Sequence, residues 1–470
     1  MSDFSAINTA LTGLLAQQQA LDTTAHNVSN ANTPGYTRET VDLQAMGGSI
    51  DPGWWSGSSS GGQGVHIGGI ERLGDLFGEA RSQADQAATS NLTQSQQILS
   101  EIQSGFAEPG PNGLSAALSN FWSSWDNVAN NPTDLSARNA LVGAAQTVSQ
   151  TFNQSVAGIQ SVWESSLSQV QSQVQQLNTI AGNVAQLNDK IRVSQASGAS
   201  PNDLIDQRTQ LLGQLAQIGG VTAHTNADGT VDAFIGGTAL VRGDVVDGLT
   251  VAQSASGVSV QWTTPPGQAS VTSGQLNGLL TSMNVTIPSY LNNLTGVANT
   301  LAQEVNNQQA SGYTLATPPA SGQPGPPMLT LTSAPGPTSS AEPTYPQLAV
   351  AAGFTPDQVA AAGSATTPGD GSNAQLAAEL GASTTGADAG YRSFIAGLGT
   401  DVQRTGSQLS TAQAVASQNS AALQGQEGVN TDEEMAHMVA FQNAYSAAAR
   451  VLTTIDSTLD TLINHTGLTT

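Results

Sequence analysis

Histidine, carboxylate and serine side chains are the groups from which this chain would have to build a reactive site, because it contains no cysteine. A metal ion needs several ligands that converge on one point, and no His-x-x-x-His pair or glutamate-rich partner pattern accompanies the histidines. The sequence therefore predicts no metal site. The five histidines are well separated along the chain: His26, His66, His224, His437 and His465. We expect His26 and His437 to be polar residues beside an apolar helix face.

Three further patterns have possible chemistry, and each has a simpler structural explanation. Residues 226–232 weakly resemble a calcium loop, but the spacing and the missing distal glutamate favour a hairpin turn. The glycines of 61–64 are not followed by the lysine of a phosphate loop. Trp54-Trp55 is either an exposed contact patch or, as we expect, a local loop anchor. No serine lies in a nucleophile elbow, so the sequence predicts no catalytic residue, no cofactor and no enzyme.

The charge and hydropathy of the sequence argue against nucleic acid and membranes as binding partners. Eleven Lys plus Arg stand against 34 Asp plus Glu, for a net charge of −23. Nucleic acid and anionic membrane surfaces attract clustered basic residues, and none are clustered here. No apolar run approaches the ~18–20 residues of a membrane span, and the first basic residue, Arg38, comes too late for a Sec signal. Only 10% of residues are charged, which suits packing against copies of the same chain.

The elements that would organise such packing are predicted at the two ends of the sequence. Apolar residues at alternating steps of three and four place one narrow apolar seam on a helix, as in a coiled coil. Each seam spans 25 positions, about 37 Å of helix. The first consists of Phe4, Ile7, Leu11, Leu14, Gln18, Leu21, Ala25 and Val28. The second consists of Met438, Phe441, Tyr445, Ala448, Leu452, Ile455, Leu459 and Leu462.

Because the two seams match in length and lie at opposite ends, we expect these helices to pair with each other. Helix boundaries agree with this expectation. Thr431 with Glu434 three residues later predicts a capping box at the start of the last helix. Pro34-Gly35 predicts a turn after the first helix.

Both ends also carry motifs of a known group. The first closely resembles the N-terminal signature of bacterial flagellar rod, hook and hook-associated proteins: Ala10-Leu11-x-Gly13-Leu14, followed by Asn27-Val28-Ser29-Asn30-Ala31-Asn32-Thr33-Pro34-Gly35-Tyr36-Thr37-Arg38. The second resembles the matching C-terminal signature: Gly428-Val429-Asn430-Thr431-Asp432-Glu433-Glu434-Met435, then Gln442-x-x-Tyr445-x-x-x-Ala449-Arg450-Val451. The residues of both motifs resemble the hook-associated protein 1 family more closely than they resemble rod or hook proteins.

The resemblance implies a structural subunit of the hook–filament junction that assembles through its terminal helices. It implies as partners further copies of the chain, the hook protein, a second junction protein and an export chaperone. It also implies secretion through the flagellar type III apparatus to the extracellular flagellum. The implied assembly interface consists of the seam residues together with the 32–38 turn, which we expect to bridge adjacent subunits: Phe4, Ile7, Leu11, Leu14, Gln18, Leu21, Val28, Asn30, Asn32, Pro34, Gly35, Tyr36, Arg38, Met438, Phe441, Tyr445, Leu452, Ile455, Leu459 and Leu462.

Between the ends, helical periodicity predicts a long helix through 152–191 and two more amphipathic stretches at 276–305 and 394–423. Residues 219–262 are β-branched and broken by turns, which predicts a small antiparallel β region. Residues 311–346 are rich in Pro, Gly, Ser and Thr and predict an irregular exposed segment.

We therefore predict a mainly α, elongated, multi-domain chain. Its expected parts are a terminal coiled-coil domain (1–45 with 426–470), a helical-bundle domain (46–218 with 271–310 and 369–425) and a β-rich outer domain (219–270 with 311–368). A hook or distal-rod protein is the structural alternative, since these share both motifs. A secreted enzyme or a glycan-binding module carried on axial termini is the alternative from another class, and it would require its site in the outer domain.

Overall fold

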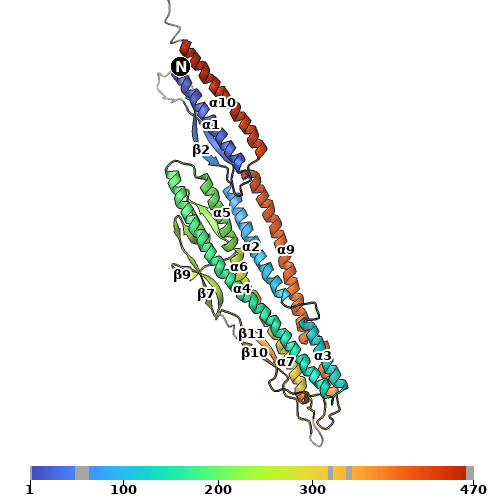
Figure 1. The fold of residues 1–470 in the computed structure, drawn as a ribbon. Coiled ribbons are helices and arrows are strands. Elements are labelled where there is room, and N and C mark those ends of the chain that lie inside the picture. Colours follow the sequence, from blue (N-terminus) through green and yellow to red (C-terminus); the bar gives the residue numbers. More distant parts are fainter. Residues whose placement is uncertain (1–2, 48–62, 316–320, 335–340, 462–470) are drawn as a thin grey trace, which may run out of the picture.

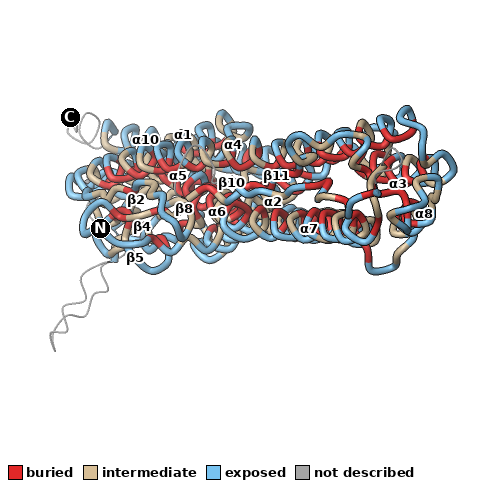
Figure 2. Tube along the Cα trace, turned by 90° about the horizontal axis from the view of Figure 1, so that it is seen from below, coloured by how far each residue is buried: buried red, intermediate tan, exposed pale blue. Residues whose placement is uncertain are grey.

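The computed structural model describes residues 3–47, 63–315, 321–334 and 341–461. They form a long rod, with the paired terminal helices at one end and α3 with α8 at the other (Figure 1; Figure 2). Its helices are α1 (Asp3–Asn30), α2 (Leu76–Ser104), α3 (Leu114–Asn130), α4 (Leu135–Ala196), α5 (Asn202–Gly219), α6 (Gly274–Thr281), α7 (Ile287–Ser311), α8 (Ser372–Glu379), α9 (Ala387–Glu427) and α10 (Thr431–Asp460). The predicted elongated, mainly helical fold with paired terminal helices is confirmed.

Helix α4 is the spine of the rod. It contains 62 residues, and its predicted part, 152–191, lies inside it. Its apolar stripe is buried along the whole length, and the indole of Trp163 is fully covered. Gly158 and Gly182 do not interrupt it, because burial of this stripe offsets the ~1 kcal/mol that each glycine costs a helix relative to alanine.

The N-terminal and C-terminal parts of the chain pack against each other as two successive helix pairs. Helix α1 packs along α10, and α2 packs along α9, so the first and last parts of the sequence lie side by side over much of the rod (Figure 1). The hairpin of β1 (Glu39–Ala45) and β2 (Val65–Arg72) covers another side of α1. The chain passes from this terminal region to the rest of the rod at residues 73–75, between β2 and α2, and returns to it at residues 428–430, between α9 and α10.

The β region predicted over 219–262 consists of two small antiparallel sheets that lie against α4. The turn predicted at 226–229 joins β3 to β4, which confirms the hairpin. One sheet contains β3 (Thr222–Thr225), β4 (Val231–Ile235), β5 (Thr238–Arg242) and β6 (Val245–Val246). The other contains β7 (Leu249–Ser254), β8 (Gly257–Thr263) and β9 (Pro266–Gln268).

Asparagine side chains fasten the strands to the helices. The amide of Asn178 on α4 donates to the carbonyl of Leu249 at 2.8 Å and accepts from its N–H at 2.9 Å. One side chain thus satisfies both backbone groups of a strand residue, as a neighbouring strand would. The same pairing recurs at other helix–strand contacts: Asn153 with Leu348, Asn188 with Val231, Asn284 with Val258, Asn306 with Leu329 and Asn27 with Glu39.

Residues 311–346, predicted to be an irregular exposed segment, are in part regular and buried. Strand β10 (Leu329–Ala334) pairs with β11 (Tyr345–Val350), and both Met328 and Leu329 are buried. This hairpin packs on α4 near Asn153, whereas β7 packs near Asn178, 25 residues or about 37 Å further along the helix. The division of the chain into three domains stays a prediction.

Candidate functional site

The two terminal motifs meet at the base of the α1–α10 pair, around the buried side chain of Asn27. Its amide oxygen accepts from the Tyr36 hydroxyl at 2.8 Å and from the N–H of Glu39 at 2.9 Å. Its amide nitrogen donates to the Glu39 carbonyl at 2.8 Å and to a carboxylate oxygen of Glu434 at 3.1 Å. One residue therefore holds the end of α1, the start of β1 and the first turn of α10 together.

The side chain of Glu434 is the buried carboxylate of this arrangement. It is only 2% exposed, and Arg38 donates to its other oxygen through Nε at 2.7 Å. Ionised carboxylates are buried only when they are paired and hydrogen-bonded, and Glu434 meets both conditions. We call Asn27, Arg38 and Glu434 the terminal clamp.

The turn after α1 is seated on α5 of the same chain. The N–H of Thr37 donates to Asp206 at 2.9 Å, and the amide of Gln210 donates to the carbonyl of Pro34. Arg72 holds the other oxygen of Asp206 through Nε at 2.6 Å. Burial and the neighbouring carboxylates raise the pKa of the Tyr36 phenol, so the hydroxyl that donates to Asn27 stays protonated.

A second carboxylate lies at the end of α9, where the chain returns to the terminal helices. Glu427, the last residue of α9, accepts from the N–H of Asp75 at 2.6 Å, and its own carbonyl accepts from the N–H of Arg38 at 2.8 Å. Burial raises the pKa of Glu427, and the nearby Glu79 carboxylate adds to the shift. The ionised form is thus disfavoured in the folded chain.

This shift predicts a pH-dependent effect of the substitution Glu427→Gln. Because the folded pKa of Glu427 lies above the usual 4.5, the folded state holds its proton longer, and the native chain loses stability as the pH rises through that window. Glutamine keeps the acceptor for Asp75 and removes the charge. We expect the melting temperature of the variant to rise relative to the native chain between pH 4 and pH 7.5. A relative fall over the same range would contradict the assignment.

The predicted α10 seam faces α1. Its described members are half-buried against the partner helix, as a coiled-coil face should be. They are Met438, Phe441, Tyr445, Ala448, Leu452, Ile455 and Leu459. Leu462 lies outside the described residues, and so does the side chain of Phe4.

On α1 the predicted seam divides into two sets. Ile7, Leu14, Leu21 and Val28, at seven-residue steps, are half-buried, whereas Leu11, Gln18 and Ala25 are exposed. The fully buried face of α1 is instead small and polar, because this helix packs on the β1–β2 hairpin as well as on α10. That face contains Ala16, Ala20, Thr23, Thr24 and Asn27.

Sequence patterns missed the clamp because its residues were assigned other roles. Glu434 was expected in a capping box, but α10 begins at Thr431, and its cap is Asn430, whose side chain accepts from the N–H groups of Asp432 and Glu433. This leaves the carboxylate of Glu434 free to bind Arg38. Within the turn, Tyr36 and Arg38 contact their own chain, while Asn32, Pro34 and Gly35 are exposed. Asn30 donates to the His26 carbonyl within α1.

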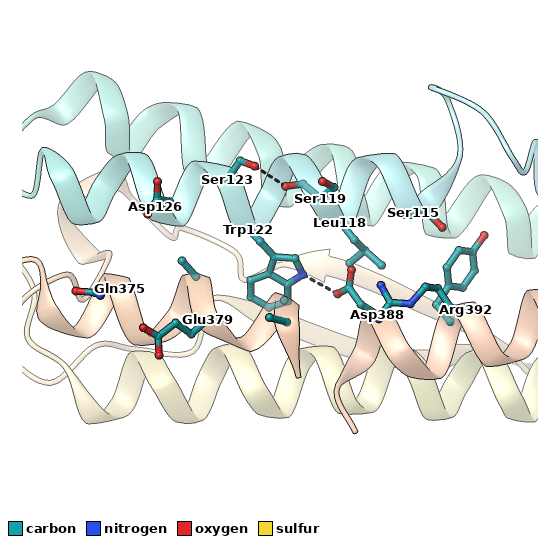
Figure 3. A pocket seen from close by; sticks show the side chains of 14 residues that line it. Ser115, Leu118, Ser119, Trp122, Ser123, Asp126, Gln375, Glu379, Asp388 and Arg392 are labelled. Atoms are coloured by element: carbon teal, nitrogen blue, oxygen red, sulfur yellow. Dashed lines mark hydrogen bonds between the residues drawn. The ribbon is translucent and has the colours of Figure 1, made fainter. Parts of the chain in front are cut away.

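Another pocket lies at the opposite end of the rod. It has a volume of about 610 Å³ and is lined by α3, α8 and the start of α9 (Figure 3). The indole of Trp122 donates to Asp388 at 2.6 Å, and burial raises the pKa of that carboxyl. Gly381 sits against the indole, where a Cβ would approach within 2.5 Å. These contacts fasten α3 to α9, and the lining contains no histidine to act as a base beside its serines.

Within 3–47, 63–315, 321–334 and 341–461, no group of three or more His, Asp or Glu is placed to hold a metal ion. None of the helices described is both long and apolar enough to cross a membrane. His26 contacts Glu39 and Tyr36, whereas His437 stacks on Phe441.

Comparison with known proteins gives three family matches in chain order. "Flagella basal body rod protein" matches residues 7–37, "Flagellar hook-associated protein FlgK helical domain" matches 99–328, and "Flagellar basal body rod FlgEFG protein C-terminal" matches 425–465. The first contains Asn27 and the third contains Glu434, and Arg38 directly follows the first. The second covers α3 to α7 and much of the β region.

Individual relatives agree. The chain is 27% identical to flagellar hook-associated protein 1 of Bacillus subtilis over 99% of both chains. It is 31% identical to flagellar hook-associated protein 1 of Salmonella typhimurium over 66% of this chain and 57% of that protein. Its fold is similar to that of the flagellar hook junction protein FlgK from Burkholderia pseudomallei, with a TM-score of 0.60, 17% identity and coverage of 73% of this chain and 99% of that one.

The three family matches, on a helical rod whose two chain ends pair, place this chain among the flagellar axial proteins, which are structural components of the flagellum. Within this class the chain belongs to the flagellar hook-associated protein 1 family. The family resemblance predicted from the terminal motifs is confirmed, and membership favours the junction function over that of a hook or rod subunit.

Proposed function

We propose that this chain forms the junction between hook and filament and that the α1–α10 pair is its assembly element. The observation that carries the proposal is the clamp: residues of both terminal motifs hold the two terminal helices together at one end of the rod. A junction subunit needs this arrangement, because force passed between neighbouring subunits would otherwise separate the two terminal helices.

The assembly surface is proposed to comprise the outer faces of this pair. Several large apolar side chains of α1 and α10 are at least 43% exposed, which is unusual for helices that remain in water and typical of contact surfaces. They are Leu11, Leu15, Met435, Val439 and Val451. We propose that the seam residues turned toward α1 hold the pair and that these outward residues contact neighbouring subunits.

The partners proposed are the hook protein on one side and a second junction protein on the other, together with further copies of this chain. Export by the flagellar type III apparatus with a chaperone, and an extracellular location, belong to the same proposal. The family resemblance supports these assignments. Among the described residues of the outer β region, no contact favours an enzyme or a glycan-binding module.

Deleting residues 1–28 or 438–470 in the native host should abolish filament attachment and release filament protein into the medium. Because such deletions also affect export, substitutions within the pair give a sharper test. Leu14→Glu with Leu21→Glu places two charges against α10, which we expect to have the same effect while the variant is still exported. Gln171→Glu with Gln175→Glu, on an exposed face of α4, is the matched control and should leave filaments attached. Normal filaments in the Leu14/Leu21 variant would refute the proposed role of the pair.

A further inference from the structure

The first turns of α10 carry an exposed apolar ridge. Met435 is 60% exposed and Val439 is 58% exposed. The two lie one helical turn apart on the same face, because residues four positions apart are neighbours on a helix. The next residues along this face, Gln442 and Ser446, are exposed and uncharged. We call Met435 and Val439 the ridge.

The other side of the same turns borders a small hollow. Its volume is about 160 Å³, and it is enclosed by α1, the β1–β2 hairpin and α10. Leu43 and Leu73 stand on its rim with 38% and 41% of their surfaces exposed. Five apolar side chains line part of it: Ala20, Val41, Leu43, Leu73 and Phe441. The rest of the lining is polar: Thr23, Thr24, Arg38, Glu39, Thr40, Glu434 and His437.

Ridge and hollow lie at the same level of the rod but face in nearly opposite directions. Val439 and Phe441 are two residues apart, which turns their side chains about 200° from each other on a helix of 3.6 residues per turn. A surface and its complement on opposite sides of one molecule form a heterologous contact, which repeats from copy to copy and builds a ring or helix.

We propose that the ridge of one copy of this chain inserts into the hollow of the next copy around the axis. A second copy is the occupant because the molecule itself carries a matching apolar surface at the required height. The contact also removes little charge from water: of the charged groups at the hollow, Arg38 and Glu434 are already paired with each other, and Glu39 is buried beside His26. This inference rests on the proposed assembly function and identifies which surfaces adjoin.

Because the chain has no cysteine, introduced cysteines can test the contact directly. Val439→Cys and Leu73→Cys are combined in one chain, expressed in place of the native copy, and oxidised on isolated flagella. We expect a ladder of dimers, trimers and larger species, since each copy joins two neighbours through different cysteines. The control combines Ser446→Cys with Leu73→Cys. It moves the thiol seven residues, about 10 Å, along the same face. That exceeds the ~7 Å Cα separation a disulfide tolerates, so we expect about tenfold less crosslinking.

The alternatives have different outcomes. Dimers from a chain with Val439→Cys alone would indicate a symmetric contact and overturn the proposal, as would stronger crosslinking in the Ser446 control. An absence of crosslinks in cells that retain attached filaments would also overturn it, while leaving the junction function intact. Filament attachment is scored separately and reports on that function. If cells that carry Val439→Cys with Leu73→Cys lack attached filaments, the combination of Val439→Cys with Leu43→Cys, on the other rim of the hollow, is tested instead. The same outcomes decide the proposal.

Discussion

Replacing Arg38 by alanine is expected to destabilise the base of the α1–α10 pair by about 3 kcal/mol, the cost of leaving a buried carboxylate without its cation. Glu434 is 2% exposed, so water cannot replace the guanidinium. Asn27 still donates to Glu434, and the positive end of the α10 dipole is close to it. These two contributions keep the expected loss at the lower end of the range for broken buried pairs.

The measurement is amide hydrogen exchange of the first turns of α10 in the purified chain. A loss of about 3 kcal/mol corresponds to roughly 100-fold faster exchange. Arg404→Ala is the matched control: it breaks an exposed pair with Asp401, three residues away on the same helix, which is worth about 0.3–0.5 kcal/mol. Equal exchange in the two variants, or amides in α10 that are already unprotected in the native chain, would contradict the clamp.

The helices and their pairing were predictable from the sequence because they depend on periodicity. The seam of α10 and the long helix through 152–191 are repeated apolar patterns that persist whatever surrounds them. The α1 seam was less well defined by its pattern. Leu11 and Leu14 have equal apolar character, yet only Leu14 turns toward α10, because β1 and β2 occupy a second side of the helix.

The clamp was not predictable from local patterns because it joins residues 407 positions apart. Thr431 and Glu434 have the spacing of a capping box. However, α10 already begins at Thr431, and the preceding residue, Asn430, is its cap. Tertiary contact with Arg38 then determines the orientation of Glu434. In the same way, nothing local marks Asn178 or Asn188 as a strand partner, since an asparagine inside a helix ordinarily faces solvent.

The second large effect is expected at Asn188 on α4, which is fully buried. Its oxygen accepts from the Val231 N–H at 3.0 Å and from the Arg208 guanidinium at 2.9 Å. Its nitrogen donates to the carbonyls of Val231 and Gly243, each at 2.7 Å. Asn188→Ala therefore removes this partner from three backbone groups and one of two acceptors from the Arg208 guanidinium, which keeps the Gly229 carbonyl at 2.7 Å. Burial, with the nearby Arg72, has already lowered the pKa of Arg208 to about 10, which reflects how poorly this cation is solvated.

We expect Asn188→Ala to cost about 3–5 kcal/mol, because three buried backbone groups lose this partner and a buried guanidinium loses one of its acceptors at the same time. Asn178→Ala is the matched control on the same helix: it breaks the same type of pairing with Leu249 but leaves no charge behind, and should cost about 1–2 kcal/mol. Urea unfolding followed by circular dichroism would measure both. A difference near zero would show that Arg208 finds other partners and that Asn188 acts only as a strand bracket. A clear excess for Asn188 would show that the long helix holds the outer β region through this one buried polar centre. The terminal clamp has the same design: in each, an asparagine satisfies a strand residue while a paired or bonded arginine lies beside it.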